Sequence, residues 1–326
     1  MVNHRLISAA ALLWLAAWAP AAPATDAGKY PTKPIRLLTP AAPGGSTDIL
    51  SRMIGGRMSE TLGQQIIVDN RSAGSGVVAA EMTAKAPPDG YTIFMAYHQH
   101  TVNASMYDKL PYRTVDDFTP ITQVTSAGLA LVVHPSTPVT NFREFLDWTR
   151  SYKGPLNFGS AGNGSGGHLA GELYKMMTGV NAQHIPYKGA GPALIDLVAG
   201  HYQFSFAGML AAQPHIRSGR LRILGVTSLK RAPGMPDTPT IAESGLPGFE
   251  IVGWYGVLAP AKLPAPLTAR LHDEIVKIIN EPRIRERIMS EGAEPVGNTP
   301  EQFRAYLHAD VAKWAKIVKA SGAKLD

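Results

Sequence analysis

The amino-acid sequence predicts an α/β fold built as two lobes of similar size. The length of 326 residues suggests about two domains. Short apolar segments of strand length alternate with longer segments whose apolar residues recur at helical spacing. Two glycine-rich turns, at 43–48 and 159–167, occupy equivalent places in this alternation, each between a strand and a helix. Only 17% of the residues are charged, which favours a folded globular chain over a disordered one.

The first part of the chain is predicted to alternate three strands with two helices. The strands are apolar and short, and the first helix is amphipathic. The predicted ranges are 35–39, 49–62, 65–69, 77–84 and 92–97. Strands joined by helices of this length imply right-handed crossovers and a parallel sheet.

The same alternation resumes in the second part of the chain. The predicted strands are 130–134, 156–160, 183–186, 204–207 and 221–227. Asn141 and Glu144 have the spacing of a capping box and predict a helix through Trp148, and a second helix is predicted at 168–177. The segment 232–248 is rich in Pro and Gly and is predicted to be irregular.

The last part of the chain is predicted to be one strand followed by helices. The strand is 254–259, and the helices are 266–279, 282–290 and 300–321. Thr299-Pro300-Glu301-Gln302 combines a capping box with proline at the first helical position. In α/β sheets a ligand binds outside the carboxyl ends of the strands, so the strand-to-helix turns are the candidate sites.

Residues 1–24 have the three-part pattern of a secretory signal peptide. A short segment ending in Arg5 precedes the apolar residues 6–19, and Ala22-Pro23-Ala24 fits a small-x-small cleavage site. The apolar segment is short for a membrane span, and an uncleaved N-terminal anchor is the alternative. We therefore expect an exported protein that begins near Thr25.

The composition excludes several classes of protein. The absence of cysteine excludes disulfide frameworks, thiolate zinc sites, iron–sulfur clusters and a cysteine nucleophile. The net charge is only +6, and Lys and Arg are dispersed without interleaved aromatic residues, which argues against nucleic-acid binding. We predict no cofactor and no metal, and nothing in the sequence demands more than a monomer.

Both glycine-rich turns place small residues at the start of a helix. Glycine lets the backbone approach a ligand closely, and the unpaired N–H groups of a helix N-terminus favour an anion. Neither turn contains Lys or Arg, and neutral donors are supplied by Ser46, Thr47, Ser160, Asn163 and Ser165. The pair of turns predicts two anionic groups held across a cleft. The alternative is two ordinary tight turns capped by Ser and Thr.

Other chemistries have weaker support. The glycines of the second turn match the G-x-G-x-x-G dinucleotide pattern, but no acidic residue follows at 181–189, about 20 residues later. His98 and His100 have strand-like spacing for a metal, yet no third ligand lies at a diagnostic distance. Asp48 is a candidate general base, although an acidic residue at a helix N-terminus more often stabilises the helix dipole.

Nine short segments along the mature chain form an ordered set. They are 30–36, 42–48, 69–71, 86–92, 110–112, 117–120, 184–189, 236–240 and 253–256. No single segment is decisive, but the ordered set is specific. It resembles the Bug family of solute receptors of tripartite tricarboxylate transporters.

The resemblance implies a periplasmic binding protein of the two-lobed, type II kind, each lobe a mixed, mostly parallel sheet flanked by helices. Lobe 1 would comprise 25–125 and 252–326, and lobe 2 would comprise 126–251, with the ligand cleft between them. We expect the hinge at the crossovers near 124–127 and 251–253.

The resemblance also implies that the loops 44–48 and 160–168 grip the carboxylates of a small ligand, partly through water. Together with the positions discussed below, the predicted ligand-binding residues are Ala42, Gly44, Gly45, Ser46, Thr47, Asp48, Tyr97, His98, Ser160, Gly162, Asn163, Ser165, His168, Ala207 and Gly208.

Departures from the family pattern bear on the ligand. Ala41 stands where many members have an aromatic residue, and Ala207-Gly208 stands where many have an aspartate that suits a ligand ammonium group. Tyr97 and His98 replace small residues and could contact a flat ligand. The hypothesis is a ligand without an amino group, an aromatic or larger dicarboxylate. The alternative is that these differences are drift in a site defined elsewhere.

Two classes of function follow. The first is a non-catalytic periplasmic receptor that captures a di- or tricarboxylate for the membrane subunits of a tripartite transporter or for a sensor. The second is an exported hydrolase that uses Asp48 and a histidine. The receptor needs only donors and a hinge, whereas no nucleophile–base pair is evident for the hydrolase.

Overall fold

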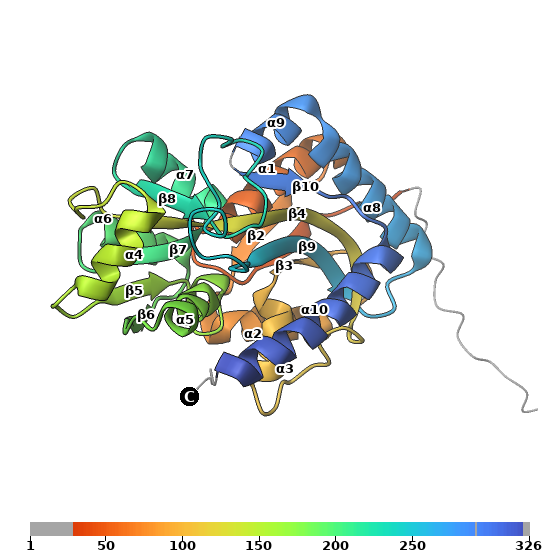
Figure 1. Ribbon diagram of the computed structural model, residues 1–326. Helices are drawn as coiled ribbons and strands as arrows, with labels where there is room; N and C mark the ends of the chain where they lie inside the picture. The colour runs from red at the N-terminus through yellow and green to blue at the C-terminus, as the bar shows by residue number, and fades with distance from the viewer. Residues whose placement is uncertain (1–28, 291, 322–326) are drawn as a thin grey trace, which may run out of the picture.

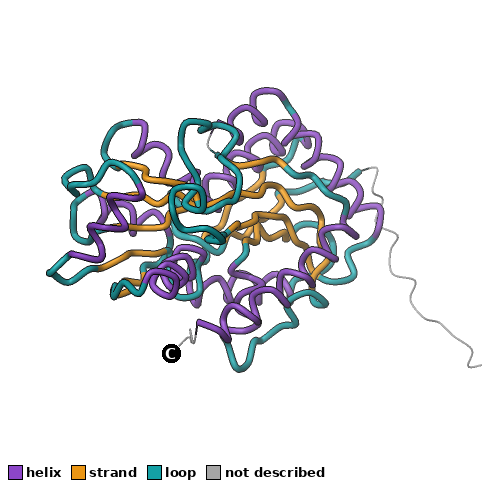
Figure 2. Tube along the Cα trace, in the orientation of Figure 1, coloured by secondary structure: helices purple, strands orange, loops and turns teal. Residues whose placement is uncertain are grey.

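The computed structural model describes residues 29–290 and 292–321. Helices surround a central set of strands, which Figure 2 shows in orange. The predicted signal peptide at 1–24 lies outside the described residues. Within the described part of the chain, no helix is long and apolar enough to cross a membrane.

Two sheets share one long strand, and the strand order across both is β2-β1-β3-β9-β4-β7-β5-β6. The first sheet contains β1 (Ile35–Thr39), β2 (Ile66–Asn70), β3 (Thr92–Tyr97), β9 (Val252–Pro260), β10 (Ala293–Pro295) and part of β4 (Phe118–Val133). The second sheet contains the rest of β4 with β5 (Asn157–Ser160), β6 (Gln183–Pro186), β7 (Phe204–Gly208) and β8 (Arg222–Val226).

Helices cover both sheets, as Figure 1 shows. Those packed on the first sheet are α1 (Ser46–Leu62), α2 (Val77–Ala84), α3 (Gln99–Met106), α8 (Ala265–Asn280), α9 (Pro282–Ser290) and α10 (Pro300–Ser321), with a short 3-10 turn, η1 (Ala73–Gly76). Those packed on the second sheet are α4 (Phe142–Ser151), α5 (Gly166–Thr178), α6 (Ala190–Val198) and α7 (Met209–Arg217).

The strand β4 changes partners at Gly128. Residues 118–128 pair with β9, whereas 129–133 pair with β7. A Cβ atom on Gly128 would stand 3.1 Å from the backbone nitrogen of Ser228, so glycine leaves room where the two sheets meet. The predicted hinge segments lie beside this change of partners, and the lobe boundaries stay a prediction.

The sheets are mixed, as expected, but parallel pairs do not dominate them. Parallel pairs join β1 to β2 and β3, and join β5 to β6 and β7. Every pair made by β4 or β9 is antiparallel. The expectation of mostly parallel sheets was wrong because β4 and β9, which connect the two halves of the chain, run antiparallel to every strand that they pair with.

The strand prediction at 130–134 captured only the end of β4, and α3 was not predicted. Residues 118–129 carry buried polar side chains without alternation, including Thr122, whose hydroxyl donates to the Asn298 carbonyl at 2.8 Å. The segment of α3 is likewise polar, yet Gln99 and Asn103 are buried and hydrogen-bonded to each other at 2.7 Å. The other predicted strands and helices are confirmed, with small shifts of their ends.

A buried carboxylate ties α10 to the first sheet. The side chain of Asp310 accepts a hydrogen bond from the Trp254 indole N–H of β9 at 2.7 Å and from the Thr101 hydroxyl of α3 at 2.6 Å. Asp310 is 6% exposed, and burial raises the pKa of its carboxyl group. Because one carboxylate serves two elements, its loss would leave a buried N–H without an acceptor.

We predict that Asp310→Ala lowers the free energy of unfolding by about 2–3 kcal/mol, since a buried donor then loses its charged acceptor. Urea unfolding at neutral pH measures this change. Asp237→Ala, at an exposed position, is the control and is expected within about 0.5 kcal/mol of the parent. Equal stability of the two variants would contradict the prediction.

Candidate functional site

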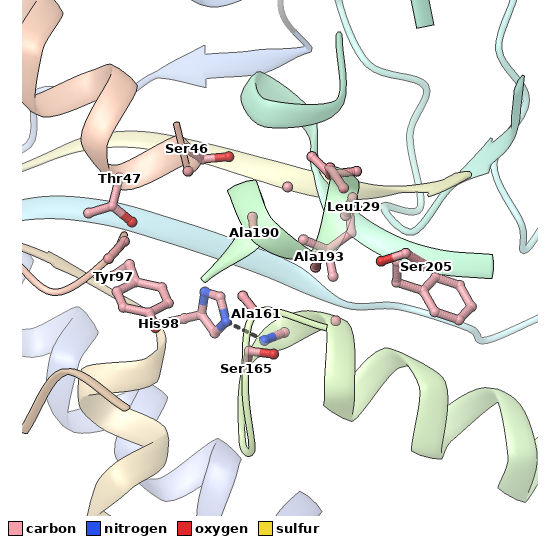
Figure 3. A pocket seen from close by; sticks show the side chains of 18 of the residues that line it. Ser46, Thr47, Tyr97, His98, Leu129, Ala161, Ser165, Ala190, Ala193 and Ser205 are labelled. Atoms are coloured by element: carbon pink, nitrogen blue, oxygen red, sulfur yellow. Dashed lines mark hydrogen bonds between the residues drawn. The ribbon is translucent and has the colours of Figure 1, made fainter. Parts of the chain in front are cut away.

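Five helix N-termini meet at one cavity between the two sheets. The N-cap residues of α1, α3, α5, α6 and α7 are Gly45, His98, Ser165, Gly189 and Gly208, and each lies at or after the carboxyl end of a strand. Residues from the start of every one of these helices line a cavity of about 50 Å³ (Figure 3). This is the edge at which α/β sheets bind ligands.

The cavity is neutral. None of the described residues that line it carries a charged side chain. The N-cap glycines of α1, α6 and α7 make no side-chain cap hydrogen bond. In the first turn of α7 the Ala211 N–H is taken by Ser46 of α1, whereas among the described residues no side-chain oxygen accepts from the first N–H groups of α1 and α6, which stay available. Backbone N–H groups and the positive dipole ends of several helices then act together on whatever enters, which suits an anion.

The first glycine-rich turn is shaped by Asp48. The Oδ2 atom of Asp48 accepts from the Gly44 backbone N–H at 3.0 Å and from Arg52 Nε at 3.1 Å. The Asn70 amide donates to Asp48 Oδ1 at 2.9 Å and to the Ala41 carbonyl at 2.8 Å. Burial alone would raise the pKa of Asp48, but hydrogen bonds from Arg52, Gly44 and Asn70 outweigh it and lower the pKa. Asp48 is therefore a paired structural anion, not the general base of the hydrolase hypothesis.

The second glycine-rich turn is shaped by two stacked histidines. Ser160 Oγ lies 2.6 Å from His184 Nε2, and the ring of His168 stacks on that of His184 with 4.0 Å between centroids. Burial lowers the pKa of both histidines, that of His184 to about 3. The backbone N–H of Gly164 donates to His168 Nδ1 at 2.9 Å. These side chains hold the backbone of the turn in place from outside the cavity lining.

The starts of α1 and α7 lie so close together that only small residues fit between them. Ser46 Oγ of α1 accepts from the Ala211 backbone N–H of α7 at 3.3 Å. A Cβ atom on Gly208 would stand 2.5 Å from that same Ser46 oxygen. A glycine is therefore needed at the start of α7 for the two helices to approach in this way.

Aromatic side chains close one side of the cavity. Tyr97 of β3 and Tyr255 of β9 are cross-strand neighbours, and their rings stack with 6.4 Å between centroids and 13° between planes. His98 Nε2 accepts from the Gly166 backbone N–H at 2.6 Å, drawn as a dashed line in Figure 3. Burial lowers the pKa of His98 to about 4, so the ring is neutral at pH 7.

The structure brings the predicted site residues to the cavity only in part. Those that line it are Gly45, Ser46, Thr47, Tyr97, His98, Ser165, Ala207 and Gly208. Those that lie outside the lining and shape the turns instead are Ala42, Gly44, Asp48, Ser160, Gly162, Asn163 and His168. His98 and His100 do not share a metal, because His100 Nε2 bonds the Thr114 carbonyl at 2.8 Å while His98 faces Gly166. The described residues contain no cluster suited to a metal ion.

Sequence reasoning missed the contribution of α6 and part of β7. The unpredicted lining residues include Ala190, Ala193 and Leu194 of α6, with Ser205 and Phe206 of β7. A strand was predicted at 183–186, so a helix start after it was a usable signal for Ala190. Nothing in the sequence indicated that the start of α6 would lie against the turn after β1, where a Cβ atom on Gly189 would stand 3.1 Å from the Ala42 backbone nitrogen.

We predict that Asp48→Asn makes the protein less stable at pH 7, because Arg52 loses its charged partner. The expected loss is only about 1 kcal/mol, since the Arg52 side chain is exposed to solvent. The lowered pKa of Asp48 means that its ionised form stabilises the fold above the ordinary pKa of 3.8, and that this contribution is lost as pH falls further. Urea unfolding at several pH values measures both effects. A difference between parent and variant that does not shrink below pH 3.8 would contradict this role.

The family model described as "Tripartite tricarboxylate transporter family receptor" matches residues 50–323. Protein BugT of Bordetella pertussis is 34% identical over 302 residues, covering 92% of this chain and 93% of that protein. The structure of Rpa4515 of R. palustris with adipate is 36% identical with a TM-score of 0.88, covering 91% of this chain and all of that one (100%). MatC from Rhodopseudomonas palustris with bound malate is 30% identical with a TM-score of 0.82, covering 89% and 100%. These matches show that the chain belongs to the TctC family of tripartite tricarboxylate transporter receptors, and similar structures are those of periplasmic binding proteins, not enzymes.

Proposed function

We propose that this protein captures a small dicarboxylate in the cavity between its two sheets and presents it to the membrane subunits of a tripartite transporter or to a sensor. The observation that carries the proposal is the meeting of helix N-termini around a cavity without charged lining. Each terminus behaves as about half a positive charge. Several of them stabilise an anion while neutral donors fix its orientation.

We propose further that the ligand lacks an amino group. An ammonium group needs an acidic or carbonyl partner, and none of the described lining residues supplies a carboxylate. Adipate and malate, named with two similar structures, are dicarboxylates of this kind. Tyr97 and Tyr255 offer ring faces to the carbon body of the ligand, which suits an aliphatic chain or an aromatic ring.

The two sheets form the proposed lobes, 25–125 with 252–326 and 126–251, and close around the ligand. This division is supported by the partner change of β4 at Gly128 and by β9, which begins at Val252. Hinge closure between two rigid lobes is a common way to enclose a ligand. Small-angle scattering that does not change at saturating ligand would contradict closure.

A thermal-shift panel tests the ligand class. We expect adipate or malate to raise the melting temperature by about 5 °C at a hundredfold excess over the dissociation constant, since a ligand of the folded form stabilises it by mass action. Glutamate, with its ammonium group, is expected to have no effect, and phthalate tests the aromatic alternative. A response to glutamate but to no other acid would contradict the proposal.

We predict that Ala207→Asp weakens binding of the responding dicarboxylate at least tenfold more than Ala207→Asn does. The two substitutions have the same size at a buried lining position, and only aspartate adds a charge that repels the ligand. Isothermal titration calorimetry measures both affinities, and circular dichroism verifies that both variants fold. Equal affinities would show that the ligand is not held as an anion beside Ala207.

The chain is proposed to reach the periplasm through cleavage of residues 1–24. The pattern at 1–24 and the family support this location. In cells that express the whole chain, mass spectrometry of the periplasmic fraction is expected to find a protein that begins at Thr25. Recovery of the intact N-terminus in the membrane fraction would instead indicate an anchor.

A further inference from the structure

His98 connects the two sheets directly. It stands at the end of β3 and the start of α3, in the first sheet, and is only 5% exposed. Its Nε2 atom accepts from the backbone N–H of Gly166, the first residue of α5 on the second sheet, at 2.6 Å. A neutral imidazole from one sheet therefore caps a helix of the other.

The fold makes room for this ring on two sides. A Cβ atom on Gly166 would stand 2.8 Å from His98 Nε2, and a Cβ atom on Gly253 of β9 would stand 2.9 Å from His98 Nδ1. The rings of Tyr97 and Trp314 lie beside it, with centroids at 5.1 and 6.2 Å. Gly253 belongs to the expected hinge, so the ring sits between that segment and α5.

The contact with Gly166 fixes the tautomer of the neutral His98 ring. Because Nε2 accepts a hydrogen bond, the proton of neutral His98 lies on Nδ1. That atom is buried and has no hydrogen-bond partner among the described residues. A protonated ring would point an N–H group at the N–H group of Gly166, and the contact between the sheets would be lost.

We propose that His98 is a positioning residue that latches the start of α5 to the first sheet when the lobes close, and that protonation of its ring releases this latch. The proposal rests on the proposed function, since closure matters for a receptor that encloses its ligand. It concerns the closing equilibrium and does not depend on which acid is bound.

The direction of the pH effect follows from the two states of the ring. Burial lowers the pKa of His98 from 6.5 to about 4 in the latched form, whereas an exposed ring in the open form has its ordinary value. The open form therefore binds more protons as pH falls below 6.5. The closing equilibrium is expected to fall about tenfold between pH 7.5 and 5.5.

Other titratable groups face this region from each neighbouring element. Tyr97 and Tyr255 are buried with raised pKa values and stay neutral over this range. On α10, Asp310 bonds Thr101 and Trp254, and Lys313 lies over the Trp314 ring. On α5, His168 is bonded to Gly164. All of these groups are unchanged in variants of His98, so a comparison of variants isolates its contribution.

Two substitutions separate the role of His98 as a hydrogen-bond acceptor for Gly166 from the protonation of its ring. In His98→Gln the amide oxygen can stand near the position of Nε2 and accept from Gly166, but it does not titrate. In His98→Phe the ring is retained without an acceptor. His100→Gln is the matched control, because His100 is also buried, has a pKa lowered to about 4 and bonds Thr114 rather than α5.

The experiment measures closure by distance. The chain has no cysteine, so Lys109→Cys near α3 and Met176→Cys on α5, both exposed, accept spin labels at two defined points. Double electron–electron resonance then gives the closed fraction at pH 7.5 and 5.5, with and without adipate. The parent and His100→Gln are expected to lose closed population at pH 5.5. His98→Gln is expected to close equally at both pH values, and His98→Phe is expected to close less at both.

Identical distance distributions for the parent, His98→Gln and His98→Phe under every condition would overturn the proposal. The same holds if His98→Gln retains the full pH effect of the parent. If adipate shifts no variant while the pH effect depends on His98, the latch stands and adipate is not the ligand. The two proposals can therefore fail separately.

Discussion

The whole arrangement depends on one strand that belongs to two sheets. Because β4 pairs with β9 over 118–128 and with β7 over 129–133, the two sheets are joined by continuous backbone. The carboxyl ends of β1 and β3 in one sheet and of β5, β6 and β7 in the other then face a common space. Every helix that starts there brings its N-terminus to that space, so the binding chemistry is a consequence of topology.

Absence of side-chain bulk allows these helix starts to come together. A Cβ atom on Gly191 of α6 would stand 2.7 Å from the Pro43 carbonyl, and one on Gly167 of α5 would stand 2.5 Å from the Phe206 carbonyl. At both places backbone would meet a side chain, and backbone cannot rotate away. The glycines of the turns thus serve packing between elements as much as contact with a ligand.

The sequence predicted most of this architecture because strands and amphipathic helices leave periodic patterns. It did not reveal the length of β4, where Thr122 and Gln123 are buried and bond the distant residue Asn298. It also did not reveal α3, where the buried side chains of Gln99 and Asn103 bond each other. The family resemblance placed Asp48 among the ligand-binding residues, whereas the structure makes it a paired anion outside the cavity lining. Arg52, four residues further along α1, was a readable i,i+4 partner of Asp48. The contact of Asp48 with Asn70 depends on how β2 packs beside β1, which no local pattern encodes.

Because the cavity lining is neutral, the binding energy for an anion must come from hydrogen bonds and helix dipoles instead of from charged side chains. With no charged side chain among the described lining residues, the proposed acid would be held by hydrogen bonds whose net contribution is about 1 kcal/mol each, somewhat more to a carboxylate. Enclosure strengthens these bonds because it removes competing water and lowers the local dielectric. The contacts that join the sheets, such as Ser46 with Ala211 and His98 with Gly166, are made by residues at the rim and lining of the same cavity. Under the proposed function, the affinity for an acid would therefore depend on how firmly the sheets close as well as on the residues that line the cavity.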